Sequence, residues 1–139
     1  MIIMAIDYGK ARTGLAICDK KEILSFPFGV IEEKDMEILC KKITEKINES
    51  KTELVVIGLP KNMDGSLGES AERVKKLGEK LKSISKINID FWDERKTTVT
   101  AHEYLNKTNT RGKKRKSIID AVSATIILQN YLDYRKKLK

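Results

Sequence analysis

Residues 2–18 read IIMAIDYGKARTGLAIC, two apolar stretches joined by a short polar link. The stretches at 2–7 and 14–18 are typical of β-strands, and strands joined by so short a link pair antiparallel. A third apolar stretch, 23–31, follows after another short link and contains Pro27, which cannot donate a hydrogen bond to a neighbouring strand. The chain therefore begins with a predicted antiparallel three-stranded meander whose third strand lies at the sheet edge.

Helix and strand patterns alternate beyond this meander. The run ELVVIG at 53–58 is almost wholly apolar, as expected of a strand buried on both faces, and 87–91 alternates apolar and polar residues like a further strand. A loop is expected at 107–116. Helices are predicted at 35–49, 67–84, 98–106 and 117–135. Right-handed crossovers then give an α/β fold with a mixed five-stranded sheet, strands 1-2-3 antiparallel and strands 1-4-5 parallel, flanked by helices.

Length and composition favour one domain that binds an anionic partner. The 139 residues match a single domain, expected to span 1–139. Lys and Arg number 28 against 20 Asp and Glu, and the net charge of +8 favours nucleic acid. The N-terminal apolar run is too short for a membrane span and has no basic leader. Cys18 and Cys40 lack metal-binding spacing, which indicates a reduced, cytoplasmic protein with both residues in its core.

Asp7 closes the first apolar strand, where a carboxylate is costly unless something uses it. It could be a ligand for Mg²⁺ or Mn²⁺, because hard cations prefer oxygen donors. Gly9 would then let a phosphate approach closely, and Lys10 or Arg12 would bind it. Equally, Asp7 could form an Asx turn that opens a hairpin. Position alone does not decide between the two.

Three further acids could join Asp7. Asp93 and Glu94 follow the fifth strand, at the end of the sheet where open α/β folds place their sites, or they form a surface acidic pair. Asp120 lies in the first turn of the last predicted helix, although Ser117 and Asp120 also fit a capping box. Acids from two strand ends and a helix start could together hold two cations.

Basic, hydroxyl and glycine residues near these acids are candidates for binding substrate phosphate. The densest basic run is RGKKRK at 111–116. Thr98 could contact a phosphate, or it could cap the helix that follows the fifth strand. The candidates are Gly9, Lys10, Arg12, Arg95, Thr98, Arg111, Lys113, Lys114, Arg115 and Lys116.

Four segments resemble the YqgF family of RNase H-like proteins, which comprises pre-16S rRNA nucleases and Holliday-junction resolvases. They are IDYGKARTGLAICD, VVIGLPKNMDGSLGESA, FWDERKTT and KRKSIIDAVSATIILQNYL, in the order of the family and over nearly the whole chain. The resemblance implies an RNase H-like fold in which Asp7, an acid of the DER segment and Asp120 form the catalytic cluster and the metal ligands. Within DER it favours Glu94, with Asp93 as the second choice.

One departure concerns the strand at 53–58, which ends in Gly58-Leu59-Pro60 where many RNase H-like nucleases carry an acid. The second ligand must then come from the fifth strand. Alternation places Asp93 in phase with Phe91 and Glu94 in phase with Trp92, but the sequence does not show where the strand ends.

The resemblance implies a nuclease that hydrolyses phosphodiester bonds with two Mg²⁺ or Mn²⁺ ions. Its expected substrate is the 5′ end of pre-16S rRNA in the small-subunit precursor. A Holliday-junction resolvase acting on four-way DNA is the alternative; it cuts two symmetric strands and is expected to be a homodimer, whereas an rRNA nuclease can act as a monomer. A non-catalytic RNA-binding module in ribosome assembly is a further hypothesis, under which Asp7→Asn would leave function intact.

Overall fold

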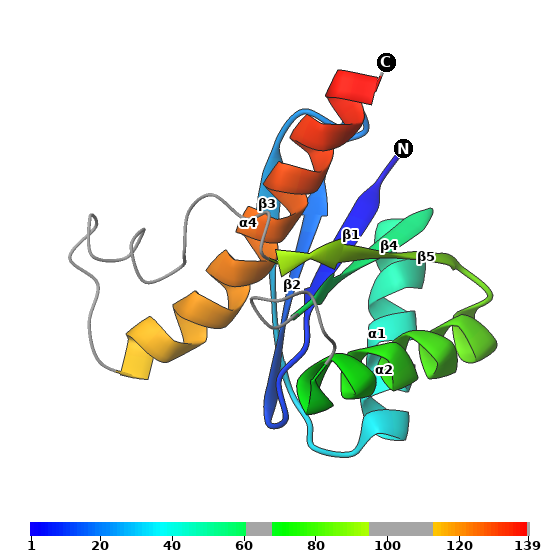
Figure 1. The fold of residues 1–139 in the computed structure, drawn as a ribbon, viewed down its shortest axis with the longest axis vertical. Helices are drawn as coiled ribbons and strands as arrows, with labels where there is room; N and C mark the ends of the chain where they lie inside the picture. Colours follow the sequence, from blue (N-terminus) through cyan, green and yellow to red (C-terminus); the bar gives the residue numbers. More distant parts are fainter. Residues whose placement is uncertain (61–67, 95–112, 139) are drawn as a thin grey trace.

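The computed structural model describes residues 1–60, 68–94 and 113–138, with the backbone alone for 113–121. Its strands form one five-stranded sheet in the order β3-β2-β1-β4-β5 (Figure 1). The strands are β1 (Ile3–Asp7), β2 (Arg12–Cys18), β3 (Ser25–Glu32), β4 (Leu54–Leu59) and β5 (Asn88–Asp93). Strands β1, β2 and β3 pair antiparallel, while β1, β4 and β5 run parallel. The predicted mixed sheet is confirmed, with β3 at one edge.

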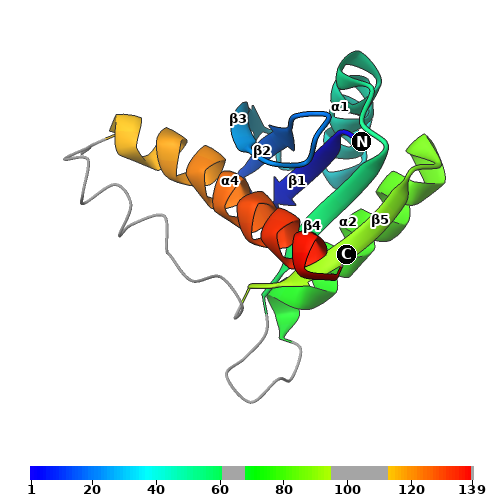
Figure 2. The ribbon, with the colours of Figure 1, turned by 90° about the horizontal axis from the view of Figure 1, so that it is seen from above.

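Helices cover both faces of this sheet, as Figure 2 shows from above. They are α1 (Met36–Ser50) and α2 (Glu69–Ser85) on one face and α4 (Lys113–Leu138) on the other. Along β1, Met4 and Ile6 pack into the α1–α2 core, while Ile3 and Ala5 pack into the α4 core. Alternation along the strand therefore puts Asp7 on the α4 face. None of the described helices has the length and apolar character of a membrane-spanning segment.

Several predicted boundaries differ from the structure, the starts of α2 and α4 among them. Residues 113–116, predicted as part of a loop, form the start of α4. They are lysines and an arginine, which are good helix formers, and no proline or glycine interrupts them. The second helix begins at Glu69, and its N-cap, Gly68, makes no side-chain capping hydrogen bond. The helix predicted at 98–106 lies outside the described residues.

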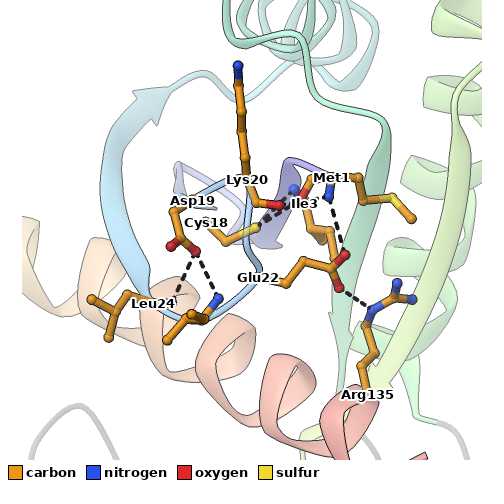
Figure 3. Close-up of polar contacts among 9 residues, drawn as sticks. Met1, Ile3, Cys18, Asp19, Lys20, Glu22, Leu24 and Arg135 are labelled. Carbon is orange, nitrogen blue, oxygen red and sulfur yellow. Dashed lines mark hydrogen bonds and ion pairs between the residues drawn. The ribbon is translucent and has the colours of Figure 1, made fainter. Parts of the chain in front are cut away.

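Glu22 connects three parts of the chain, which are the N-terminus, the β2–β3 connection and α4 (Figure 3). Its carboxylate accepts hydrogen bonds from the Met1 α-amino group at 3.3 Å and from Arg135 Nε at 2.9 Å. Burial would raise the pKa of Glu22, but the hydrogen bonds from Arg135 and the amino group outweigh it and hold the pKa below 4.5. Nearby, Cys18 Sγ accepts from the Ile3 N–H at 3.2 Å. Both Cys18 and Cys40 are buried, as predicted.

Candidate active site

The half-buried Asp7 is the last residue of β1 and lies at the carboxyl ends of the parallel strands β1, β4 and β5. A glycine lies beside it on each of the two neighbouring strands. Asp7 pairs with Gly14 of β2. On its other side, Ile6 pairs with Ile57 of β4, so Asp7 and Gly58 directly follow the last pair. Neither neighbouring position contributes a side chain next to the Asp7 carboxylate.

The pairing of β5 with β4 continues to Asp93, which lies opposite Leu59. Asp93 therefore shares the alternation of Ile89, which packs against the α1–α2 core on the face away from Asp7. Trp92 belongs to the α4 core and forms an edge-to-face contact with Tyr131.

Glu94 directly follows the last residue of β5, and its side chain lies on the α4 face, because a β-carbon on Gly58 would approach both Glu94 and Ile127 of α4. Its carboxylate lies against Gly58 of the neighbouring strand, since a β-carbon on that glycine would be 2.8 Å from Glu94 Oε1. Burial raises the pKa of Glu94, and the charge of Asp93 raises it further. Both effects disfavour the ionised carboxylate, and a bound cation would offset them.

Asp120 is carried by the N-terminal part of α4, and its side chain lies outside the described part of the structure. Its backbone position precedes Ala124 and Ile127 by four and seven residues, or about one and two helical turns. Ala124 is fully buried, and Ile127 Cδ1 would lie 2.7 Å from a β-carbon on Gly58. The helical phase of Ala124 and Ile127 therefore packs on the sheet.

The donor chemistry of the described acids suits a divalent cation. Asp7 and Glu94 supply carboxylate oxygens, which hard cations prefer, and the Glu94 carboxylate lies over Gly58 of the strand between them. Among the described side chains, no group of three acids, histidines or cysteines is placed to hold a metal ion. The third expected ligand, Asp120, is not among those side chains.

Comparison with known proteins identifies the family. A family model named RuvX and described as Holliday junction resolvase matches residues 1–134. The chain belongs to the RuvX family. This bears out the resemblance of its four sequence segments.

Relatives of this RuvX chain extend over its whole length. It is 42% identical over 138 residues to a protein of Caldanaerobacter subterraneus subsp. tengcongensis named "Putative pre-16S rRNA nuclease", covering 98% of this chain and 99% of that protein. A Halothermothrix orenii protein of the same name is 41% identical over 138 residues, covering 99% of both chains.

Solved structures share the RuvX chain's fold. T. thermophilus RuvC in complex with a Holliday junction substrate matches with a TM-score of 0.64 at 11% identity, over 97% of this chain and 96% of that one. The fowlpox virus resolvase with Holliday junction DNA matches with a TM-score of 0.52 at 13% identity, over 99% of each chain. The predicted RNase H-like fold is confirmed.

Three of the predicted phosphate-binding residues of this RuvX chain lie in the loop after β1 and at the start of β2. A β-carbon on Gly9 would strike the Arg12 carbonyl oxygen, so the loop's own backbone requires this glycine. Lys10 is exposed. Arg12 shares the alternation of Gly14 and so the face of Asp7, and it lines a surface hollow with Ala11, Glu32, Glu33 and Lys34.

The remaining phosphate-binding candidates cannot be placed at the site. Arg95, Thr98 and Arg111 lie outside the described residues. The backbone of residues 113–116 opens α4, but the side chains of Lys113, Lys114, Arg115 and Lys116 are not described. The sequence analysis identified Gly58 only as a position without an acid. It missed the contact between Gly58 and Glu94, because a contact between residues far apart in the sequence leaves no periodic pattern along the chain.

Proposed function

We propose that this RuvX chain is a divalent-metal-dependent nuclease that hydrolyses phosphodiester bonds, with the 5′ end of pre-16S rRNA as its substrate. The observation that carries the proposal is that Asp7 and Glu94 lie on one face of the sheet, at the carboxyl ends of parallel strands, with Gly58 on the strand between theirs. The names of the relatives that are 42% and 41% identical support pre-16S rRNA as the substrate.

Asp7, Glu94 and Asp120 would hold Mg²⁺ or Mn²⁺ as a pair of ions. Bound ions of this kind stabilise the negative charge that develops on the phosphate and on the leaving oxygen. Strand β1 fixes the position of Asp7, while Lys10 and Arg12 beside it would neutralise and orient the substrate phosphate. The net charge of +8 favours the approach of a polyanion.

The family description supports a second candidate function, the resolution of four-way DNA junctions. The same acids would serve, because both reactions hydrolyse a phosphodiester. The two functions differ in symmetry, since a resolvase cuts two equivalent strands and needs two copies of the site. We favour the rRNA substrate, for which one copy suffices.

Cleavage of both substrates by matched variants tests the proposal. Pre-16S rRNA and a four-way DNA junction are incubated with Mg²⁺, Mn²⁺ or EDTA, and light scattering gives the oligomeric state. We expect metal-dependent cleavage of the rRNA precursor, lost in Asp7→Asn, Glu94→Gln and Asp120→Asn. Glu45→Gln, which changes an exposed acid of α1, should retain it.

Four outcomes would contradict the proposal in different ways. Cleavage that persists in EDTA would exclude the metal mechanism. Full cleavage by all three site variants would show that these acids are not the catalytic metal ligands. No cleavage by the wild type, with RNA binding unchanged in the three variants, would indicate a binding module whose acids are structural. Junction cleavage by a dimer, without cleavage of the rRNA precursor, would assign the chain to junction resolution.

A further inference from the structure

Gly58 is the β4 residue that lies between the strands of the two described acids, and it is buried. A β-carbon at this position would be 2.8 Å from Glu94 Oε1, 3.3 Å from Glu94 Cδ and 2.7 Å from Ile127 Cδ1. Contacts this short do not persist, so any larger residue at position 58 would have to displace the ends of both side chains.

The backbone does not explain why a glycine is present here. Gly58 is not among the residues with positive φ, so its conformation is open to any amino acid. A glycine inside a strand costs conformational entropy and often marks a close approach by another group. The groups that approach Gly58 are the ends of the Glu94 and Ile127 side chains.

The order of the strands explains why the Glu94 side chain passes over Gly58. Strand β4 separates β5 from β1 (Figure 1), and two strand spacings amount to about 10 Å. An acid at the end of β5 must therefore cross β4 to approach Asp7. The Glu94 carboxylate occupies the space above Gly58, where a side chain from β4 would otherwise lie.

We propose that Gly58 is a positioning residue whose missing side chain seats the Glu94 carboxylate, so that an acid from β5 reaches a divalent cation beside Asp7. The inference rests on the proposed function and deepens it. It also explains how the site works without an acid at the end of β4: the carboxylate comes from the next strand, and the glycine gives it room.

Substitution of Gly58 by alanine tests the inference. Both contacted groups are the ends of rotatable side chains, so we expect Gly58→Ala to fold with the Glu94 carboxylate displaced. Mn²⁺ affinity, measured by titration calorimetry, should fall on the order of 10- to 100-fold, the range typical of residues that orient a metal ligand. In a Glu94→Gln background, the alanine should cause no further loss.

Two controls separate this role from ordinary packing. A β-carbon on Gly78 of α2 would lie 2.8 Å from Phe91 Cζ, so Gly78→Ala introduces a similar contact away from the site and should retain Mn²⁺ affinity. Ile127→Val removes the Cδ1 atom near Gly58. If the glycine served only to accommodate Ile127, adding this change to Gly58→Ala would restore Mn²⁺ affinity.

Wild-type Mn²⁺ affinity in Gly58→Ala, or its recovery with Ile127→Val, would overturn the inference. Crystal structures of the wild type and Gly58→Ala provide a readout independent of activity: we expect the Glu94 carboxylate to move, and a fixed carboxylate with a displaced Ile127 would also overturn it. A wild-type protein that neither binds Mn²⁺ nor cuts either substrate would contradict the proposed function, while the crystal structures would still decide the role of Gly58.

Discussion

At the scale of single residues, the adjacent acids Asp93 and Glu94 provide a matched comparison. Only Glu94 shares the face of Asp7, because pairing of β5 continues through Asp93. We expect Glu94→Gln to slow Mn²⁺-dependent cleavage by more than the roughly 10- to 100-fold loss typical of a residue that only orients a ligand. Asp93→Asn should retain most of the rate. A severe loss in Asp93→Asn with normal cleavage by Glu94→Gln would reverse the assignment.

The sequence predicted the position of Asp7 and narrowed the acid of the fifth strand to two neighbours. It could not choose between them, because alternation identifies a face only as far as a strand remains paired, and the pairing partner lies more than thirty residues away along the chain. The sequence did not predict the contact of Glu94 with Gly58 either. The contribution of Asp120 stays a prediction.

At the scale of elements, the start of α1 depends on Asp35. Its carboxylate accepts a hydrogen bond from the Ile38 N–H at 3.0 Å and so caps the helix. We expect Asp35→Ala to lower the free energy of unfolding by about 1 kcal/mol, measured by urea denaturation. Asp35→Asn keeps a capping oxygen and should retain most of the stability. Equal losses in both variants would argue against the capping role.

The existence and order of the described elements followed from hydrophobic periodicity, because most of the strands and helices pack a face against the core. Their ends were harder to predict. The basic run at 113–116 suggested a solvated loop, yet charged residues with high helix propensity extend α4 as readily as they form a loop. The start of α2 at Glu69 also escaped prediction, because its N-cap, Gly68, offers no side chain to signal it.

At the scale of the whole molecule, Glu22 joins the β2–β3 connection to α4 through Arg135. The pKa of Glu22 in the folded protein is lowered, so its contribution to stability is fully present above the ordinary pKa of a glutamate and is lost as the pH falls through the lower pKa of the folded state. We expect Glu22→Gln to lower the free energy of unfolding by about 1–2 kcal/mol at pH 7. The difference from wild type should shrink in acid, as denaturation at a series of pH values would reveal.

Arg135→Gln and the double variant complete a thermodynamic cycle for this ion pair. If the two side chains stabilise the fold through each other, the double variant should lose less stability than the sum of the single losses. Additive losses, or a pH dependence unchanged by Glu22→Gln, would show that the ion pair does not join these elements energetically.

The outer edge of β3 has a consequence for the protein at high concentration. Pro27 offers no N–H there, and the pairing register of β3 shifts beside Gly29, whose φ is 127°. An exposed strand edge is ordinarily a template on which another chain can add a strand, and interruptions of this kind make it a poor one. Pro27 and the register shift beside Gly29 thus disfavour edge-to-edge aggregation at this side of the sheet.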